Sequence, residues 1–258
     1  MSTNKNPRFI MVLGILIYMF LYLPIIILIL YSFNDSRINV SWVGFTLKWY
    51  KLLISDKQLV KAVINSLLIA TCASFISVIL GTCAGVALHK HKIPILSSLV
   101  MIPIATPELL IGVSLLLFFM LIHFTLGYVS ITLAHIAFCL SFVTIAVKTR
   151  MHGMDDSILE AARDLGANSF QSFYLVLIPM ILPGIIAGGL MAFTLSIDDF
   201  VITFFTTGVD SVTLPIAIYS MLKMGITPEI NAISTMLIII TLTLIVIARK
   251  LSPQMFSY

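Results

Sequence analysis

The sequence predicts an all-α polytopic membrane protein with six transmembrane helices, both termini in the cytoplasm and short helices on the cytoplasmic side. Composition is the first reason: 60% of the 258 residues are hydrophobic and only 10% are charged, whereas soluble domains carry about 25% charged residues. The second reason is that six apolar segments approach or exceed the ~20 residues that a membrane span needs. They are residues 9–33, 62–88, 94–121, 128–147, 180–205 and 232–248.

The first apolar segment is interpreted as a retained span and not as a cleaved secretory signal. A signal peptide has an apolar core of about 7–15 residues. Residues 9–33 form a much longer run, and no small-residue cleavage pattern follows it. We therefore expect an additional N-terminal helix here.

The distribution of lysine and arginine among the connections predicts the orientation of the spans. Nine of these residues fall on one side of the membrane and six on the other. The clusters HKHK at 89–92 and KTR at 148–150 directly adjoin span ends, where positive charge favours the cytoplasmic side most strongly. Both termini are therefore expected in the cytoplasm.

Charge and cysteine content exclude several classes of protein. The net charge of +4 is explained by basic residues at helix ends that face anionic lipid, so membrane lipid is an expected partner. No basic stripe with interleaved aromatic residues occurs, so no nucleic acid is expected. Three cysteines are too few for a disulfide framework. An intramembrane enzyme is disfavoured because no HExxH or other metal-ligand spacing involves His123 or His135, and no metal is expected.

The third apolar segment contains a helix break. Pro103 and Pro107 lie in its middle, and Glu108 follows directly. Proline removes a backbone donor and kinks or breaks a helix, and such breaks occur in membranes where the backbone faces protein or a water-filled cavity. We expect Pro107 in the first turn of a second half-helix, with Glu108 near its positive end.

Two connections on the outer side have recognisable content. Residues 34–61 hold Trp42 and three further aromatic residues among polar ones. They predict an amphipathic segment on the membrane interface, or alternatively a contact with a partner on that side. Residues 206–231 predict a loop with a short helix at about 214–224.

A polar insert at 157–179 separates the fourth and fifth spans on the cytoplasmic side. Ser157 and Glu160 fit a capping box, with Ser157 as N-cap. Gly166 stands where a C′ glycine would end this helix. Asn168 or Ser169 is expected to cap a second short helix, which Pro179 ends. The sequence predicts two short helices with a tight bend at the glycine.

The apolar stripe of the first short helix allows two interpretations. It consists of Ile158, Ala161, Ala162 and Leu165 at helical spacing. Either the stripe packs on neighbouring loops and Glu160 only caps its own helix, or the small alanines beside a charge form a helix that docks into a partner's groove.

This segment resembles the EAA loop of the permeases of ABC importers, the MetI-like family. The family pattern is E-A-A, three residues, G, nine residues and I-x-L-P. The positions that match are Glu160, Ala161, Ala162, Gly166 and Pro179, while Val176 and Ile178 replace one apolar residue by another.

The resemblance implies a mechanism for the insert. In the family the loop is a coupling helix that docks on a separate ATP-hydrolysing subunit, which assigns docking to Glu160–Ala162 and the bend to Gly166. No GxxxxGK[ST] pattern occurs in this chain. ATP and Mg²⁺ are therefore expected on a partner, with no cofactor in this chain, which is a transport subunit and not an enzyme. One transmembrane domain, 1–258, is expected, with the family core at 61–249 and the additional span at 9–33.

Acidic residues at membrane depth point to the cargo. Asp198 and Asp199 lie in FTLSIDDFVITFF, near Ser196, and Glu108 adjoins the break in the third segment. A carboxylate inside a membrane is costly, so it normally faces a cavity, pairs or has a function. No lysine or arginine occurs inside the spans, and negative charge beside a path favours a cationic cargo. Alternatively, the acids lie at the outer interface or are protonated and bonded to backbone.

Over nearly its full length the sequence is similar to permease subunits of spermidine/putrescine importers. The stretches that carry this similarity include YLPIIILILYSFNDSR, EAARDLGANSF, FTLSIDDFVITFFTTG and LPIAIYSMLKMGITPEINA. The resemblance implies a bacterial inner membrane location, a second permease subunit, an ATPase dimer and a periplasmic polyamine-binding protein. The implied substrate-path residues are Asp198, Asp199, Glu108, Ser196 and Trp42.

Two other transport functions are alternatives. The same importer class could carry another small cargo, such as a ferric ion, thiamine or another organic cation. A proton-driven secondary transporter could also use membrane carboxylates. However, such transporters usually show inverted repeats and paired broken helices, and we find neither in this sequence.

Overall fold

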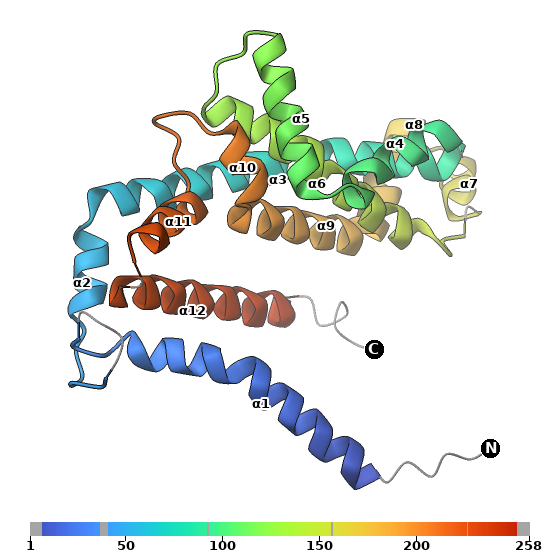
Figure 1. Cartoon of the computed structure of the whole chain (residues 1–258). Helices are drawn as coiled ribbons and strands as arrows, with labels where there is room; N and C mark the ends of the chain where they lie inside the picture. Colours follow the sequence, from blue (N-terminus) through green and yellow to red (C-terminus); the bar gives the residue numbers. More distant parts are fainter. Residues whose placement is uncertain (1–6, 37–40, 92, 156, 226, 252–258) are drawn as a thin grey trace. The chain divides into compact units, whose positions relative to one another are not determined.

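The computed structural model describes residues 7–36, 41–91, 93–155, 157–225 and 227–251, with side chains described between residues 10 and 243. These residues are almost entirely helical (Figure 1), apart from connections and one isolated bridge between Asn34 and Phe45. The elements are α1 (Pro7–Tyr31), α2 (Lys48–Ser55), α3 (Lys57–His91), α4 (Pro94–Ala105), α5 (Glu108–Leu121), α6 (Tyr128–Met151), α7 (Ser157–Asp164), α8 (Ser169–Gln171), the π-helix η1 (Ser172–Leu177), α9 (Ile178–Asp198), α10 (Val201–Thr206), α11 (Leu214–Met224) and α12 (Pro228–Leu251).

Four helices are long and apolar enough to cross a membrane, and a fifth span results if the bent pair α4 and α5 counts as one. The four are Ile10–Tyr31, Lys57–His91, Tyr128–Met151 and Ser169–Asp198. The expected sixth span, 232–248, lies in α12, where the side chains from 244 onward are outside the described residues. A nearly all-helical protein with four or five apolar spans is therefore confirmed, while the sixth span and the position of the termini stay predictions.

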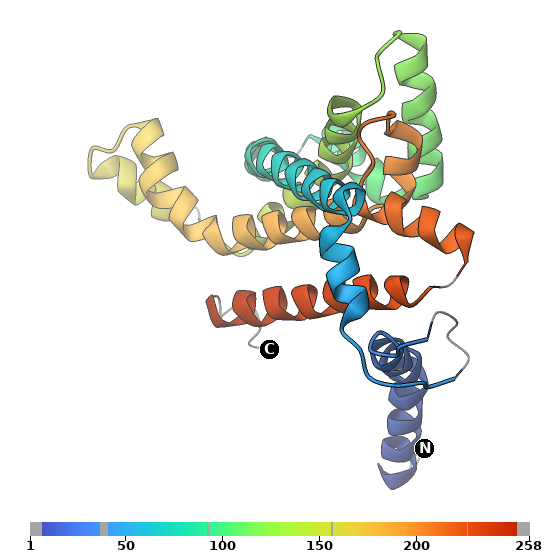
Figure 2. The same ribbon diagram turned by 90° about the vertical axis from the view of Figure 1, so that its left-hand side faces the viewer.

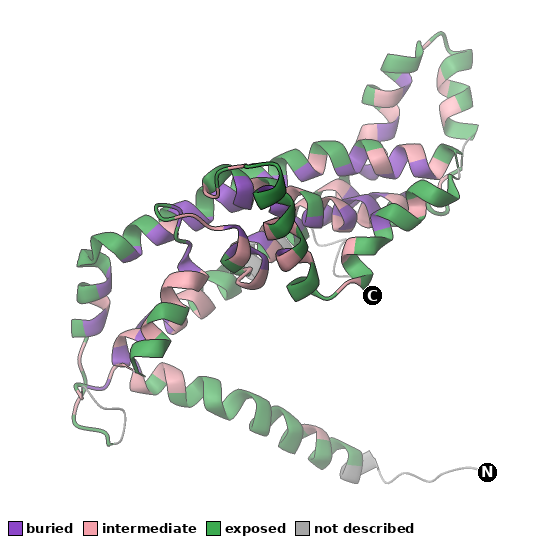
Figure 3. Cartoon of the chain, turned by 45° about the horizontal axis from the view of Figure 1, so that its top comes forward, coloured by how far each residue is buried: buried purple, intermediate pink, exposed green. Residues whose placement is uncertain are grey.

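The chain forms two compact units, one from residues up to Val60 together with Ile218–Leu251, and one from Lys61–Ala217. In the first unit, α12 packs against α1 and α2. Most side chains of α1 are exposed (Figure 3), including Phe20. An apolar helix with so little protein contact suits a lipid surface.

The outer connection folds into α2 and is fixed to the end of α1. The Trp49 indole is buried, and its Nε1 donates to the carbonyl of Asn34 at 2.8 Å. Ser32 Oγ and Tyr50 Oη share a hydrogen bond of 2.7 Å. The rings of Phe33 and Phe45 stack at 5.3 Å. These contacts fix α2 to the residues that follow α1.

The core of the second unit is the pair α6 and α9, which lie side by side (Figure 1). Small residues allow this approach: a Cβ on Gly184 would lie 2.7 Å from Cβ of Arg150, and one on Gly188 would lie 3.0 Å from Cα of Val143. On α3, Gly81 meets the same Val143 side chain. Because helices in lipid gain from close packing, small residues at their interfaces stabilise the bundle.

The predicted break in the third segment is confirmed. The axes of α4 and α5 differ by 108°. Pro107 is the N-cap of α5 with extended ψ of 133°, one position earlier than expected, and Glu108 is the first helical residue. Thr106 Oγ1 donates to the carbonyl of Ile102 at 2.7 Å, so a side chain satisfies part of the backbone at the bend.

The expected fifth span, 180–205, is not one helix. α9 ends at Asp198, and α10 begins at Val201 after an interruption at Asp199 and Phe200. α10 then packs against α5, where a Cβ on Gly112 would lie 2.8 Å from the Phe205 ring. The chain is therefore interrupted directly before α5 and directly before α10, and these two helices pack against each other.

Candidate functional site

The polar insert begins at α7, but its N-terminus is not the expected capping box. α7 already starts at Ser157, whose backbone N–H donates to Asp155 Oδ1 at 3.0 Å. The hydrogen bonds from Ser157 hold the pKa of the Asp155 carboxyl below its ordinary value. Ser157 is therefore the first helical residue and not the N-cap. Within the described residues its N–H does not donate to Glu160, and the Glu160 N–H does not donate to Ser157 Oγ, so that prediction is wrong.

The glycine bend is confirmed. Gly166 has φ of +91°, a conformation that residues with a Cβ rarely adopt. Its N–H donates to the carbonyl of Arg163 at 2.9 Å, and the N–H of Ala167 donates to the carbonyl of Ala162 at 3.1 Å. These two bonds define a Schellman motif, which ends α7.

The second short helix has the expected cap but not the expected end. Asn168 accepts from the N–H of Gln171 and its own N–H donates to Gln171 Oε1, both at 2.9 Å. The chain then continues through η1 into α9, so Pro179 lies in continuous helix near the start of α9. The widened π-turn directly before Pro179 accommodates a residue without an N–H. The expectation that Pro179 ends the helix is therefore wrong.

The predicted apolar stripe of α7 is not covered by this chain. α7 has no buried residue, and Leu165 is 90% exposed. Glu160 and Ala161 are exposed and Ala162 is half-buried. This outward stripe favours the docking interpretation over packing on neighbouring loops.

Aromatic residues of the following turn extend this surface. Phe170 is 74% exposed and stacks on Tyr174, with ring centroids 6.1 Å apart. Figure 2 shows α7 and α8, in yellow, at the end of α9. An exposed apolar and aromatic patch on a polar insert is typical of a protein interaction site.

The residue that holds α7 in place was missed from the sequence. Leu159 packs against the buried cluster that includes Leu177 and Met151. The signal was present, because Leu159 is an apolar residue about 100° around the helix from Ile158 and therefore lies outside the exposed stripe.

The adjacent acids Asp198 and Asp199 have different surroundings. The side chain of Asp199 is 6% exposed, and its Oδ2 lies 3.3 Å from Nε2 of His135. It also accepts at 2.7 Å from both the N–H and the hydroxyl of Thr203. Asp199 therefore caps the start of α10 and pairs with a buried histidine.

Ser196 belongs to the same buried network. Its Oγ lies 2.6 Å from Nδ1 of His135, and the other ring nitrogen lies 3.0 Å from Oγ1 of Thr203. His135 thus joins α6 to both sides of the interruption between α9 and α10. Sequence reasoning left His135 without a specific role, although a buried imidazole at membrane depth needs a partner.

Asp198 and Glu108 are exposed, in contrast to Asp199. Asp198 is the last residue of α9 and Glu108 is the first of α5. The helices that follow the two interruptions, α5 and α10, pack against each other. Among the residues that the structure describes, Lys61 with Asp210 is the only ion pair that involves a lysine or arginine. The two exposed carboxylates at the helix interruptions therefore have no lysine or arginine partner in this part of the chain.

Trp42 lies in the other compact unit, where its side chain is 52% exposed. The structure therefore places Asp198 and Glu108 at two helix interruptions, and Asp199 and Ser196 in the histidine network.

The fold, the insert and the helix interruptions define a class of membrane transport subunit. The chain belongs to the family described as binding-protein-dependent transport system inner membrane component, whose profile matches residues 77–252. It is therefore a multi-pass inner-membrane protein, homologous to the permease subunits of ABC importers.

Similar proteins refine this class. The spermidine/putrescine transport system permease protein PotC of Escherichia coli K12 is 39% identical over 239 residues, which cover 92% of this chain and 90% of that protein. The putrescine transport system permease protein PotI of the same strain is 38% identical over 244 residues, covering 91% and 86%. PotC of Haemophilus influenzae is 38% identical over 241 residues, covering 92% and 94%.

Solved structures share the fold. A chain of a bacterial ABC transporter involved in the import of the polysaccharide alginate superposes with a TM-score of 0.73 at 18% identity, covering 97% of this chain and 98% of that chain. A chain of the MetNI methionine ABC transporter gives 0.63 at 17% identity, covering 83% and 100%.

Proposed function

We propose that this chain forms half of the membrane path of an ATP-driven importer for polyamines, spermidine or putrescine, and couples that path to a separate ATPase. The observation that supports a polyamine cargo is that Asp198 and Glu108 are both exposed at two helix interruptions. Carboxylates form charge-assisted hydrogen bonds with ammonium groups. A polyamine carries several ammonium groups along an apolar chain, so two carboxylates match it better than a single one.

Within this proposal the predicted path residues divide into two roles. Asp198 and Glu108 contact the cargo. Asp199 and Ser196 act indirectly, because their hydrogen bonds with His135 and Thr203 fix the interruption that presents Asp198. Trp42 offers an exposed aromatic face, which attracts a cation, and is proposed for cargo or binding-protein contact.

The proposed assembly contains this chain, a second permease similar to PotB, two ATPase subunits similar to PotA and a periplasmic binding protein similar to PotD. The exposed surface of α7 supports docking of the ATPase through Glu160, Ala161 and Ala162. The Schellman turn at Gly166 sets the direction of that surface. The proposed topology has six transmembrane helices with both termini in the cytoplasm.

Uptake of labelled spermidine tests the cargo directly. Cells that lack this chain and every other polyamine importer are compared with the same cells in which the chain is restored. We expect uptake to be lost and recovered, and to require ATP. Unchanged uptake would overturn the polyamine assignment and leave the family in place. A competition panel of ferric ion, thiamine and other organic cations then identifies the cargo.

A further inference from the structure

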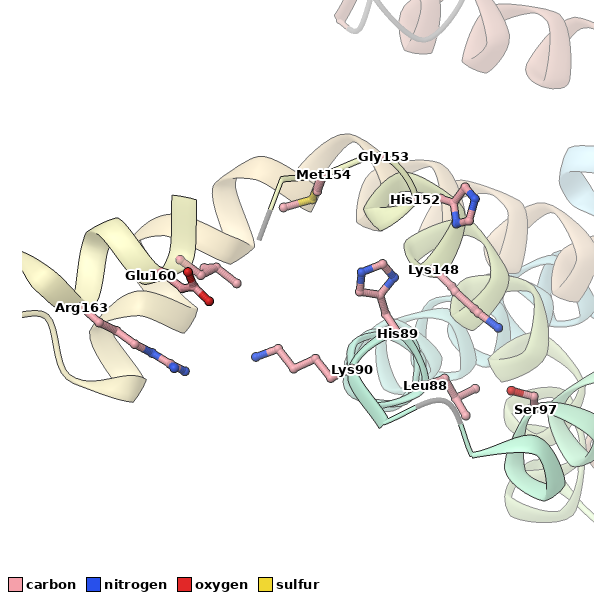
Figure 4. A pocket seen from close by; sticks show the side chains of 11 residues that line it. Leu88, His89, Lys90, Ser97, Lys148, His152, Gly153, Met154, Glu160 and Arg163 are labelled. Carbon is pink, nitrogen blue, oxygen red and sulfur yellow. The ribbon is translucent and has the colours of Figure 1, made fainter. Parts of the chain in front are cut away.

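A basic cavity of about 930 Å³ lies among the ends of α3, α4 and α6 and the side of α7 (Figure 4). Five of its lining side chains are lysine, arginine or histidine, and one is acidic. The basic ones are His89, Lys90, Lys148, His152 and Arg163, and the acid is Glu160. All of these residues belong to the second compact unit.

The cavity carries uncompensated positive charge. With the histidines neutral, Lys90, Lys148 and Arg163 contribute three positive charges and Glu160 one negative charge, a balance of +2. Across the described residues none of the three cations has an ion-pair partner within 4.0 Å. Figure 4 shows Lys90 extending from the end of α3 toward the side of α7 that carries Glu160 and Arg163. Such a cavity attracts an anion.

An apolar hollow of about 340 Å³ lies along α4. It is lined by Ser97, Ser98, Met101, Ile102 and Ala105, and Ser97 also lines the basic cavity. Neighbouring side chains of α4, including Ile95 and Leu99, are exposed and apolar. A charged cavity and an apolar hollow therefore meet at one serine.

We propose that this pair of hollows binds an anionic phospholipid, with its phosphate in the basic cavity and part of an acyl chain along α4. A phosphate diester matches the positive balance, and basic pockets between transmembrane helices commonly take anionic headgroups. A soluble phosphate could occupy the basic cavity, but it has no apolar part that would bind in the hollow along α4. The shared Ser97 therefore favours the amphiphile.

An occupied site would connect elements that are otherwise held by few contacts. Glu160 and Arg163 stand on α7, which has no buried residue, while Lys90 and Lys148 end α3 and α6. A headgroup that bridges Arg163 and Lys90 would stabilise α7 against the ends of these helices. This inference does not depend on the identity of the cargo.

The test measures lipid binding by the complete importer in an uncharged detergent. Native mass spectrometry gives the affinities of dioleoyl phosphatidylglycerol and dioleoyl phosphatidylcholine for the wild type, for Lys90→Gln/Lys148→Gln and for Arg150→Gln. Arg150 is the matched control, because it is two residues from Lys148, does not line the cavity and keeps the Cβ and Cγ that pack on Gly184.

We expect the wild type to prefer phosphatidylglycerol. The double variant should lose about 25-fold of that affinity, since each cation near a lipid surface contributes roughly fivefold. Arg150→Gln should retain the preference. Equal losses in both variants would overturn the site. The same holds if the double variant melts earlier without lipid but keeps its lipid preference, because the lysines would then act only on the helix ends.

Inorganic phosphate and glycerophosphoglycerol separate a lipid from a soluble ligand. If the acyl chain contributes, neither compound at millimolar concentration displaces phosphatidylglycerol. Displacement by inorganic phosphate would assign the cavity to a soluble anion and overturn the lipid proposal.

Discussion

His135 and Asp199 form a buried pair, with Nε2 and Oδ2 separated by 3.3 Å, across the interruption between α9 and α10. The neighbouring Asp198 is exposed. Two adjacent carboxylates with the same sequence context therefore have different chemistry. The pair with His135 fixes the backbone at the point where Asp198 leaves the end of α9.

Replacing His135 by leucine should destabilise the second unit strongly. The substitution leaves the Asp199 carboxylate buried beside an apolar side chain, and breaking a buried pair on one side typically costs about 3–5 kcal/mol. The melting temperature of the purified importer measures the effect. Asp198→Asn is the control, because its exposed side chain should change stability little. Similar melting of the two variants would contradict the assigned roles.

Replacing Asp198 by asparagine should weaken uptake while the importer assembles normally. A charge-assisted hydrogen bond to an ammonium group contributes about 1.5–3 kcal/mol. Its loss should raise the KM for spermidine by roughly tenfold or more. Initial uptake rates at several concentrations give this value. Asp210→Asn removes the same charge from an exposed carboxylate 3.7 Å from Lys61 and should leave KM unchanged. An unchanged KM in Asp198→Asn would remove this residue from the path.

Composition and local signals predicted much of the fold. Apolar runs located the first four spans, Pro107 located the break before α5, and Gly166 located the bend after α7. Each of these signals acts on the backbone within a few residues of itself. The backbone conformation at these positions therefore follows from the local sequence, without a contribution from tertiary packing or lipid.

The features that depend on tertiary structure could not be predicted. Pro179 normally ends a helix, but the π-helix before it changes which carbonyl groups need a donor. The pairing of Asp199 with His135 joins α10 to α6, which are far apart in the sequence. The separate roles of Asp198 and Asp199 follow from this pairing, so the sequence alone left both as path residues.

Replacing Glu160 by alanine should uncouple ATP hydrolysis from uptake. Glu160 is exposed on a helix without buried residues, so the variant should fold and reach the membrane normally. ATPase activity of the purified importer and uptake by cells are measured together, and the ratio of uptake to hydrolysis should fall. Asp164→Ala, on the same exposed helix, is the matched control. A normal ratio in Glu160→Ala would contradict the docking role.

Acidification should fray the start of α7. The hydrogen bonds from Ser157 lower the pKa of Asp155 from 3.8, so the folded form binds this proton more weakly than the unfolded form. The stabilisation is therefore present above pH 3.8 and is lost as the pH falls through the lower folded value. Hydrogen exchange of the first amides of α7 should accelerate in that window in the wild type. In Asp155→Ala these amides should exchange faster than in the wild type above pH 3.8, and the difference should vanish as the wild-type carboxyl is protonated. Equal rates above pH 3.8 would contradict this cap.

Replacing Gly166 by valine should disturb coupling through the backbone and not through a clash. A Cβ at this position meets no atom within 4 Å, but φ is +91°, and a β-branched residue in the left-handed region costs roughly 1–2 kcal/mol. The bend after α7 should then open, which turns the exposed surface of α7 away and lowers the ratio of uptake to ATP hydrolysis.

Gly166→Asn provides the matched control, because asparagine tolerates the left-handed region better than other residues with a side chain. We expect the asparagine variant to keep most of the coupling that the valine variant loses. If both variants lose the same amount of coupling, the positive φ of Gly166 is not the reason. The open space around Gly166 would then be needed for contact with a partner.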